Sequence, residues 1–317
     1  MKEFIHKMIS KIKHAGLGRI LWVIFRTGML LGVCYVILYP LFVKLSVAFM
    51  DKSDMYDMTV KWIPKNFTLD NFKRIFRLID YEKYLFTQLF VTGLSVLLQL
   101  ITTSFAAYSF SRFDFRFKNT IFFVVLLTLI IPQQTYMVTS YVQFRYFDFF
   151  GLGQLWGMAG SSTINTPIPV LLMSLGGVAP RCGLYIYVLR QFFKNLPVEI
   201  EEAAFVDGAG VLSTFWRVML PNSITALTTI VVFSFVWSWN DLYTATTYMP
   251  AMKLFPLLLN NLTSSITTTL GRSMVDTIEI SMITNAGVLM ILLPIILFFM
   301  LAQRLFIEGI ERTGLTG

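Results

Sequence analysis

The sequence has little of what metal proteins and disulfide-stapled proteins depend on. Among its 317 residues there are only two cysteines and two histidines. Cys34 and Cys182 both lie inside apolar runs, which argues against a disulfide framework. His6 and His14 stand in the N-terminal arm with no cysteine or carboxylate ladder beside them. We therefore predict no metal site.

Motifs for catalysis and nucleotide binding are missing as well. The sequence has no Gly-Lys dipeptide, so it cannot form the phosphate-binding loop G-x-x-x-x-G-K-[ST]. Neither G-x-S-x-G nor H-E-x-x-H occurs, which argues against an enzyme. The formal net charge is +8, but the basic residues are not gathered on a soluble domain with stacking aromatics. No nucleic-acid partner is predicted.

Apolar residues are what the sequence has in excess. Hydrophobic types make up 56% of the chain and charged types only 14%, whereas roughly 45–50% apolar residues is usual in soluble domains. They fall in runs of more than about 20 residues, the length that a helix needs to cross a bilayer. We predict an all-α polytopic membrane protein in contact with membrane lipid.

Six spans are predicted from the lengths of these runs and the breaks between them. They are Ile20–Met50, Tyr84–Phe110, Asn119–Val142, Thr166–Gln191, Asn222–Tyr248 and Ile278–Phe306. The first run is too long for the apolar region of a cleaved signal peptide, so we interpret it as an uncleaved span.

The polar segments between the spans give the expected organisation. They are an N-terminal arm 1–19, an extracytoplasmic loop 51–83, a core 84–306 that contains the loop 197–221, and a tail 307–317. Lysines and arginines crowd the arm and the short loop Ser111–Asn119. By the positive-inside rule, both termini are then expected in the cytoplasm.

Two further patterns predict local features. In Trp62–Phe76, Thr68 stands at a good N-cap place before apolar residues at helical spacing, so we expect a short amphipathic helix that touches either a soluble partner or the lipid headgroups. Pro132 interrupts the third span and is followed by Gln133 and Gln134. This break indicates either a lined pathway or a kink that serves packing.

The stretch EEAAFVDGAGVLSTFWRVMLP, from Glu201 to Pro221, is unusually polar for this chain. Pro197 suits the first turn of a helix, and the carboxylates that follow it lie near the positive end of the helix dipole. Gly208 can supply a turn, and Val211–Leu220 reads as a second helix. The pattern predicts a helix-turn-helix that is either a docking surface or an ordinary interfacial loop.

The spacing within this stretch is specific. Glu202-Ala203-Ala204, three residues, Gly208, nine residues and then Val218-Met219-Leu220-Pro221 resembles the EAA loop of ABC importer permeases, with only Val218 departing from the pattern EAA, x3, G, x9, I-x-L-P. The WND triplet Trp239–Asp241 and the tail QRLFIEGIERTGLTG resemble carbohydrate permeases of the MalG type. The outer IPKNFTLDNFKRIF segment is similar to theirs too.

This resemblance implies a transport subunit with the type I ABC importer permease fold, in the cytoplasmic membrane of a bacterium. Its implied partners are a second homologous permease, two ATPase subunits and an extracytoplasmic solute-binding protein. The chain itself would bind no cofactor, because ATP and Mg are used by the ATPase. The residues that the resemblance assigns to ATPase coupling are Glu202, Ala203, Ala204, Asp207, Gly208, Leu220 and Pro221.

The implied cargo is a sugar, and an oligosaccharide above all. Flat aromatic rings beside amides and acids suit sugars, and the candidate residues for the cargo path are Trp239, Asn240, Asp241, Tyr243, Gln133, Gln134 and Asn285, with Gln99 weaker. For Asn240 and Asp241 we favour a structural role near the path over direct contact. A non-sugar solute, or an ion-coupled secondary transporter, is the alternative, but the predicted spans hold few acids that could relay protons.

Overall fold

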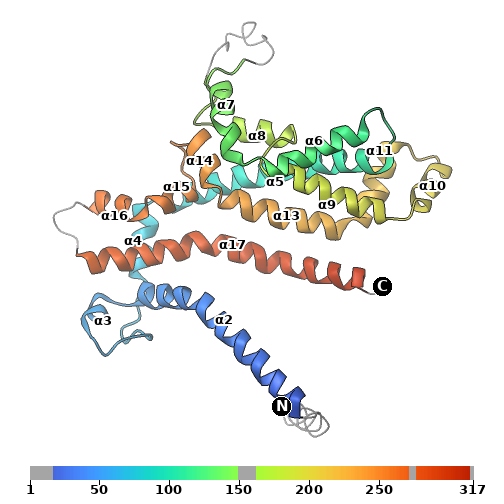
Figure 1. Cartoon of the computed structure of the whole chain (residues 1–317). Coiled ribbons are helices and arrows are strands. Elements are labelled where there is room, and N and C mark those ends of the chain that lie inside the picture. Colours follow the sequence, from blue (N-terminus) through green and yellow to red (C-terminus); the bar gives the residue numbers. More distant parts are fainter. Residues whose placement is uncertain (1–16, 149–161, 271–275, 315–317) are drawn as a thin grey trace. The chain divides into compact units, whose positions relative to one another are not determined.

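The computed structural model describes residues 17–148, 162–270 and 276–314 (Figure 1). They form two compact units. The first takes the described residues of Met1–Ile75 and Ile266–Leu289, and the second takes those of Phe76–Ser265 and Met290–Gly317. Within the described ranges the structure is helical without a strand, and a single antiparallel bridge joins Met50 to Phe67. The predicted all-α class is confirmed.

The described residues form helices in the following order along the chain. The first part of the chain forms α2 (Leu17–Phe49), α3 (Lys52–Tyr56), α4 (Asp70–Leu78), α5 (Tyr81–Arg112), α6 (Lys118–Ile130), α7 (Gln133–Arg145), α8 (Ile168–Leu175) and α9 (Cys182–Asn195). The rest forms α10 (Glu199–Val206), α11 (Val211–Thr214), the π-helix η2 (Phe215–Met219), α12 (Leu220–Asn222), α13 (Ile224–Trp239), α14 (Leu242–Tyr248), α15 (Phe255–Asn260), α16 (Leu262–Leu270) and α17 (Thr277–Gly314).

Three single helices are long and apolar enough to cross a membrane. They are Leu21–Phe49, Tyr81–Arg112 and Thr277–Gln303. Two bent pairs pass the same test when each pair is taken together, α6 with α7 at 102° and Val211–Asn222 with α13 at 79°, so the described residues offer three to five candidate spans.

Two predicted spans are not the single helices that we expected. Thr166–Gln191 is divided into α8 and α9, because Gly177 and Arg181 adopt positive φ angles of 68° and 71° and a helix cannot continue through that geometry. Asn222–Tyr248 is divided into α13 and α14 at Asn240 and Asp241. The helix that contains the sixth predicted span continues beyond it, since α17 runs to Gly314 and includes most of the predicted tail 307–317, while the candidate span within it is Thr277–Gln303.

Proline has different effects at different sites. Pro132 separates α6 from α7, as the sequence predicted, and Pro169 lies in the first turn of α8, where its missing N–H costs no hydrogen bond. Pro294 lies inside α17, which continues past it. Only the first of these prolines therefore marks a bend between two helices.

Most of the predicted amphipathic helix, α4, belongs to the first unit. The Thr68 hydroxyl accepts a hydrogen bond of 3.1 Å from the Asp70 N–H at its start. On its inner face, the buried Asn71 amide donates to the carbonyl groups of Ala48 (3.0 Å) and Met50 (2.9 Å). These bonds satisfy carbonyls near the end of α2 that have no partner within the helix, so α4 is fixed to α2 by a buried polar contact.

The second unit is built around α5, which packs against α8, α9 and α13 (Figure 1). One buried cluster joins the C-terminal half of α5 to α9, η2 and α13, with Tyr108, Leu189, Phe193, Phe215 and Ile230 as members. Another surrounds Val91 near the start of α5 and includes Cys182, which is fully buried. The unit thus has an apolar core at each end of α5.

Candidate functional site

The polar stretch 197–221 forms the helix-turn-helix that the sequence predicted. We call it the 197–221 hairpin. Its first arm is α10, and its second is the continuous helical segment α11, η2 and α12. Gly208 forms the turn with φ of 83°, and a Cβ atom added there would meet open space. The turn therefore requires glycine because of its backbone angle and not because of crowding.

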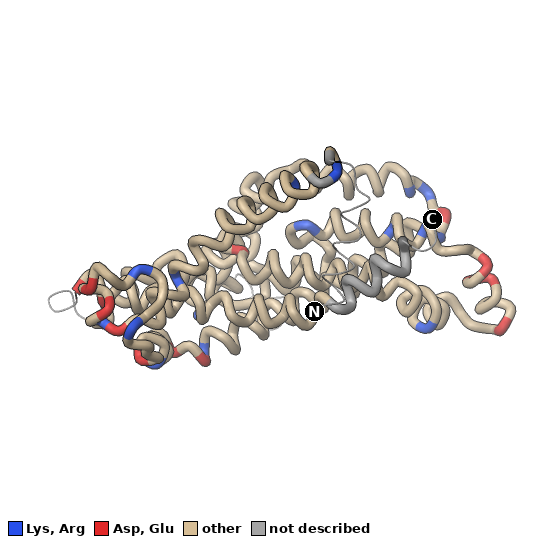
Figure 2. Tube along the Cα trace, turned by 90° about the horizontal axis from the view of Figure 1, so that it is seen from below, with Lys and Arg blue, Asp and Glu red and all other residues tan. Residues whose placement is uncertain are grey.

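The tip of the hairpin is exposed. Glu202, Ala203, Asp207 and Gly208 share it, while Ala204 is half-buried. Acidic residues gather on the projecting α10 segment (Figure 2). Exposed apolar side chains accompany them: Phe205, Val206, Val211, Leu212 and Trp216, of which Val206 is 87% exposed. Leu220 and Pro221 lie instead at the base, where the hairpin joins α13.

The base of the hairpin is fixed by Glu201, a residue that the sequence reasoning did not single out from its neighbours. Its side chain is buried, and the residue is 4% exposed. Tyr108 donates its hydroxyl proton to Glu201 Oε1 at 2.5 Å, and Arg112 Nε forms an ion pair with Oε2. Arg112 Nη2 also donates to the Leu196 carbonyl at 2.8 Å. These contacts join α10 to the last turn of α5.

A signal for Glu201 is present in the sequence. Consecutive helical residues project about 100° apart, so Glu201 and Glu202 cannot both face solvent equally. Arg112, in the short basic loop 111–119, is a natural partner for whichever carboxylate faces inward. Only the packing of α10 on α5 decides which one that is.

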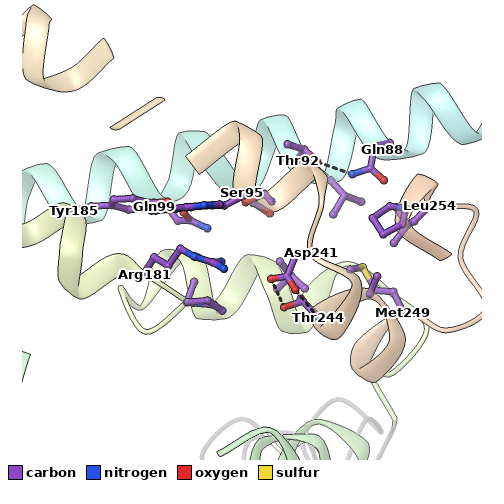
Figure 3. Close-up of a pocket in the computed structure, with 18 residues that line it drawn as sticks. Gln88, Thr92, Ser95, Gln99, Arg181, Tyr185, Asp241, Thr244, Met249 and Leu254 are labelled. Atoms are coloured by element: carbon purple, nitrogen blue, oxygen red, sulfur yellow. Dashed lines mark hydrogen bonds between the residues drawn. The ribbon is translucent and has the colours of Figure 1, made fainter. Parts of the chain in front are cut away.

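The second site is a small cavity beside α5. It measures about 40 Å³ and is lined by residues of α5, α9 and the break between α13 and α14 (Figure 3). Its polar lining consists of Gln88, Thr92, Ser95, Gln99, Arg181, Tyr185, Ser238, Asp241 and Thr244. A volume this small has room for only a few water molecules, so the cavity is closed to a sugar in this conformation.

Two buried glutamines of α5 join it to its neighbours. Gln88 donates to the Thr92 hydroxyl (3.0 Å) and the Trp239 carbonyl (3.4 Å), and it accepts from the Phe255 N–H at 3.1 Å. Gln99 accepts from the Ser234 hydroxyl at 2.7 Å and donates to the Ser174 hydroxyl at 3.3 Å. Opening the cavity must therefore exchange these hydrogen bonds for others.

The WND triplet forms the break between α13 and α14. Asn240 Nδ2 donates back to the Val236 carbonyl (2.8 Å), and Asp241 caps α14 by accepting from the Thr244 N–H at 3.0 Å. The other Asp241 oxygen accepts from the Thr244 hydroxyl at 2.7 Å, and that hydroxyl accepts from Gln133 at 2.9 Å. The break at Pro132 is thus hydrogen-bonded to the break at Asp241.

The residues predicted for the cargo path do not form one site. Asp241 lines the cavity, and Gln133 reaches it through Thr244. Trp239 is buried and lies with Asn240 on a separate hollow of about 430 Å³. Tyr243 and Gln134 are exposed. Asn285 belongs to the first unit, where it accepts a hydrogen bond from Lys44 at 3.3 Å.

The cavity contains polar residues that the sequence reasoning missed. Gln88, Thr92 and Ser95 are among them, and they recur with the predicted Gln99 at spacings of four, three and four, which places all four on one face of α5. That stripe was readable in the sequence. Arg181 could not be found in the sequence, because it lies at the end of a helix break that was not predicted. Its guanidinium lies 4.7 Å from the centre of the Trp237 ring.

Comparison with known proteins decides the family. Residues 99–312 match the family described as binding-protein-dependent transport system inner membrane component. The chain belongs to this family. The match includes the 197–221 hairpin and the WND triplet, and it covers the described residues 99–148, 162–270 and 276–312.

Individual relatives cover nearly the whole chain. It is 25% identical over 306 residues to the galactooligosaccharides transport system permease protein GanQ of Bacillus subtilis, covering 94% of this chain and 97% of that protein. It is 28% identical over 293 residues to the sn-glycerol-3-phosphate transport system permease protein UgpE of Yersinia enterocolitica, covering 89% and 93%. The chain is an inner-membrane transport component and not an enzyme.

A solved structure shares the fold. A chain of a bacterial ABC transporter involved in the import of the acidic polysaccharide alginate matches with a TM-score of 0.71 and 19% identity, covering 92% of this chain and 98% of that one. The predicted ABC permease fold is confirmed by this likeness together with the family match.

Proposed function

We propose that this inner membrane component imports an oligosaccharide as one half of a permease heterodimer. Two ATPase subunits, which bind and hydrolyse ATP with Mg, act from the cytoplasm, and an extracytoplasmic solute-binding protein delivers the cargo. Both termini then face the cytoplasm. The relatives named for galactooligosaccharides and starch degradation products support a carbohydrate cargo.

The observation that carries this proposal is the contrast within the 197–221 hairpin. Its tip exposes Phe205 and Val206 beside the carboxylates of Glu202 and Asp207, while its base is held by a buried ion pair. An apolar patch with an acidic rim suits a cleft that has basic residues at its edge. The ATPase is the partner that this surface fits.

The helix breaks support a cargo path beside α5. The breaks at 176–181 and 240–241 contribute residues to the cavity, and the break at Pro132 is hydrogen-bonded to it through Gln133. Interrupted helices expose backbone groups and are the places where transporters form polar sites. Import then requires the broken helices to move away from α5, because the present cavity holds no sugar.

Reconstitution of the full importer in liposomes tests the proposal. We expect Glu202→Lys and Gly208→Val to lower both the retention of ATPase subunits and ATP-driven uptake by about tenfold, a coupling loss within the usual range. Glu199→Gln, which changes an exposed carboxylate at the start of α10, is the matched control. Normal retention and uptake with both tip variants would contradict docking at the hairpin.

The same vesicles test the cargo. Labelled short oligosaccharides and glycerol 3-phosphate are offered separately, each with a solute-binding protein from a neighbouring gene. ATP-dependent uptake of the oligosaccharides is the expected result. Uptake of glycerol 3-phosphate alone would replace the carbohydrate assignment and leave the ATP-driven permease assignment in place.

A further inference from the structure

The 197–221 hairpin contacts α5 with both of its arms. From the first arm, Glu201 is bound by Tyr108 and Arg112, a set of three residues that we call the clamp. From the second arm, Phe215 stacks on Phe105 with ring centres 4.5 Å apart, and Trp216 meets the same ring edge-on at 5.7 Å. A displacement of either arm therefore acts on the last turns of α5.

We propose that the clamp makes α5 the element that carries motion of the hairpin to the cavity. This inference rests on the proposed docking of an ATPase at the hairpin tip. It assigns Tyr108, Arg112 and Glu201 a positioning role in coupling, separate from the docking role of the tip.

The continuity of α5 favours this route. It is a helix of 32 residues without proline, and it places Gln99 about 14 Å and Gln88 about 30 Å along its axis from Tyr108. Both glutamines line the cavity. The covalent route through α13 is bent by 79° where it leaves the hairpin and is interrupted again at Asn240. A rigid rod transmits displacement over such lengths better than a jointed one.

Burial explains why the clamp is rigid. The side chains of Arg112 and Glu201 are 11% and 6% exposed, so neither charge has water to replace its partner. Separating them would leave an uncompensated charge in a dry environment, which is strongly disfavoured. The Arg112 bond to the Leu196 carbonyl further fixes the entry to α10. The hairpin and α5 therefore move together.

The test uses the reconstituted complex with all its subunits and measures cargo molecules imported per ATP hydrolysed. We expect Glu201→Gln to lower this ratio by about tenfold, within the usual range of coupling between sites. Its ATPase retention is expected to stay normal, because the hairpin tip is unchanged. Glu199→Gln, on the exposed face of the same helix, is expected to leave the ratio unchanged.

A double variant separates coupling from general damage. If Arg112 and Glu201 act as one unit, Arg112→Gln with Glu201→Gln lowers the ratio no further than either change alone. Additive losses would overturn the clamp. Should Glu201→Gln fail to assemble, Tyr108→Phe decides, since it removes one hydroxyl: a lowered ratio supports the clamp and an unchanged ratio overturns it.

The two proposals fail in different ways. If Glu202→Lys and Gly208→Val disturb ATPase retention while Glu201→Gln leaves the ratio at its wild-type value, the clamp is wrong and docking stands. If the tip variants also leave retention and uptake normal, docking itself is wrong, and the clamp is overturned with it.

Discussion

The second unit contrasts one unbroken helix with three interrupted ones. α5 runs for 32 residues with a stripe of buried polar side chains, whereas α6 and α7, α8 and α9, and α13 and α14 are pairs divided at Pro132, at 176–181 and at Asn240-Asp241. Side-chain hydrogen bonds fix the breaks in position, and α5 provides the surface against which the divided helices pack. The continuous helix α5 thus carries the buried polar side chains, and the three helix breaks belong to the helices around it.

Interrupting α5 is expected to have the largest effect of the changes considered, because it breaks this continuous helix and so lowers the amount of assembled complex. Leu97 is 52% exposed, so Leu97→Pro changes mainly the backbone. The lost hydrogen bond and the ring clash cost about 3 kcal/mol or more, and we expect little assembled complex on size-exclusion chromatography. Leu97→Ala, which keeps the helix, should assemble normally. A folded, active Leu97→Pro permease would show that α5 need not be continuous.

Removing the polar contact between α5 and its neighbours is expected to have the next largest effect. Gln99→Leu leaves the buried hydroxyls of Ser234 and Ser174 without this partner, at a cost of about 1–3 kcal/mol. Thermal unfolding of the detergent-solubilised protein measures the loss. Gln134→Leu changes an exposed glutamine and should leave the unfolding temperature unchanged; equal losses for both would contradict the assigned burial.

Gly183 on α9 packs closely against α6, and this contact offers a third test. A Cβ atom at Gly183 would lie 2.4 Å from Thr128 Oγ1 and 2.9 Å from the Val125 carbonyl oxygen. Gly183→Ala should therefore destabilise the protein by about 1–3 kcal/mol, the usual cost of overpacking. Gly93→Ala, where the added atom meets nothing within 4 Å, is the control on α5.

The joint at Asp241 distinguishes a structural carboxylate from one that contacts cargo. Asp241→Asn keeps a good helix cap for α14, while Asp241→Ala loses it at about 1 kcal/mol. If the role is structural, uptake by the asparagine variant stays near wild type and the alanine variant is less stable. Loss of uptake in Asp241→Asn with unchanged stability would show that the charge itself is needed.

The smallest expected effect is on the unfolding temperature, from a change at Asp80, just before the start of α5. The Lys253 ammonium 2.7 Å from Asp80 lowers the pKa of that carboxyl. The stabilisation it provides is present above the unfolded-state pKa and is lost as the pH falls through the lower folded-state value. Asp80→Asn should therefore unfold at a slightly lower temperature at neutral pH, with the difference vanishing in acid. Because the pair is exposed, salt should weaken it too.

Local signals in the sequence predicted part of this arrangement. Pro132 lacks an N–H and the hairpin carries glycine at its turn, so both could be read without tertiary information. The break at Gly177 and Arg181 could not, because a glycine pair is tolerated within apolar helices and an arginine at positive φ has no sequence signature. Asn240 and Asp241 were predicted to have a structural role near the cargo path, but the sequence did not predict that they end one helix and begin another, which their hydrogen bonds show.

The candidate sites likewise divide into residues that the sequence pointed to and residues that depend on tertiary packing. The residues of the hairpin tip were assigned by the resemblance to the EAA loop, and the structure places most of them at an exposed turn. The anchoring carboxylate Glu201 depends on which side of α10 meets α5, and that is a property of packing between distant segments. The cavity as a whole was not predicted, for a similar reason: Gln88, Thr92 and Ser95 look like isolated polar residues until the helix face that they share with Gln99 is considered.

The small volume of the cavity has a consequence for the leakage of ions through the subunit. A chamber of about 40 Å³, whose buried glutamine amides are already bonded to hydroxyl and backbone groups of the protein, offers a hydrated ion no free amide to replace its water shell. A hydrated ion therefore does not fit that chamber in this conformation. The closure that shuts out cargo between import cycles thus also limits the leak of hydrated ions that a permanently open path would allow.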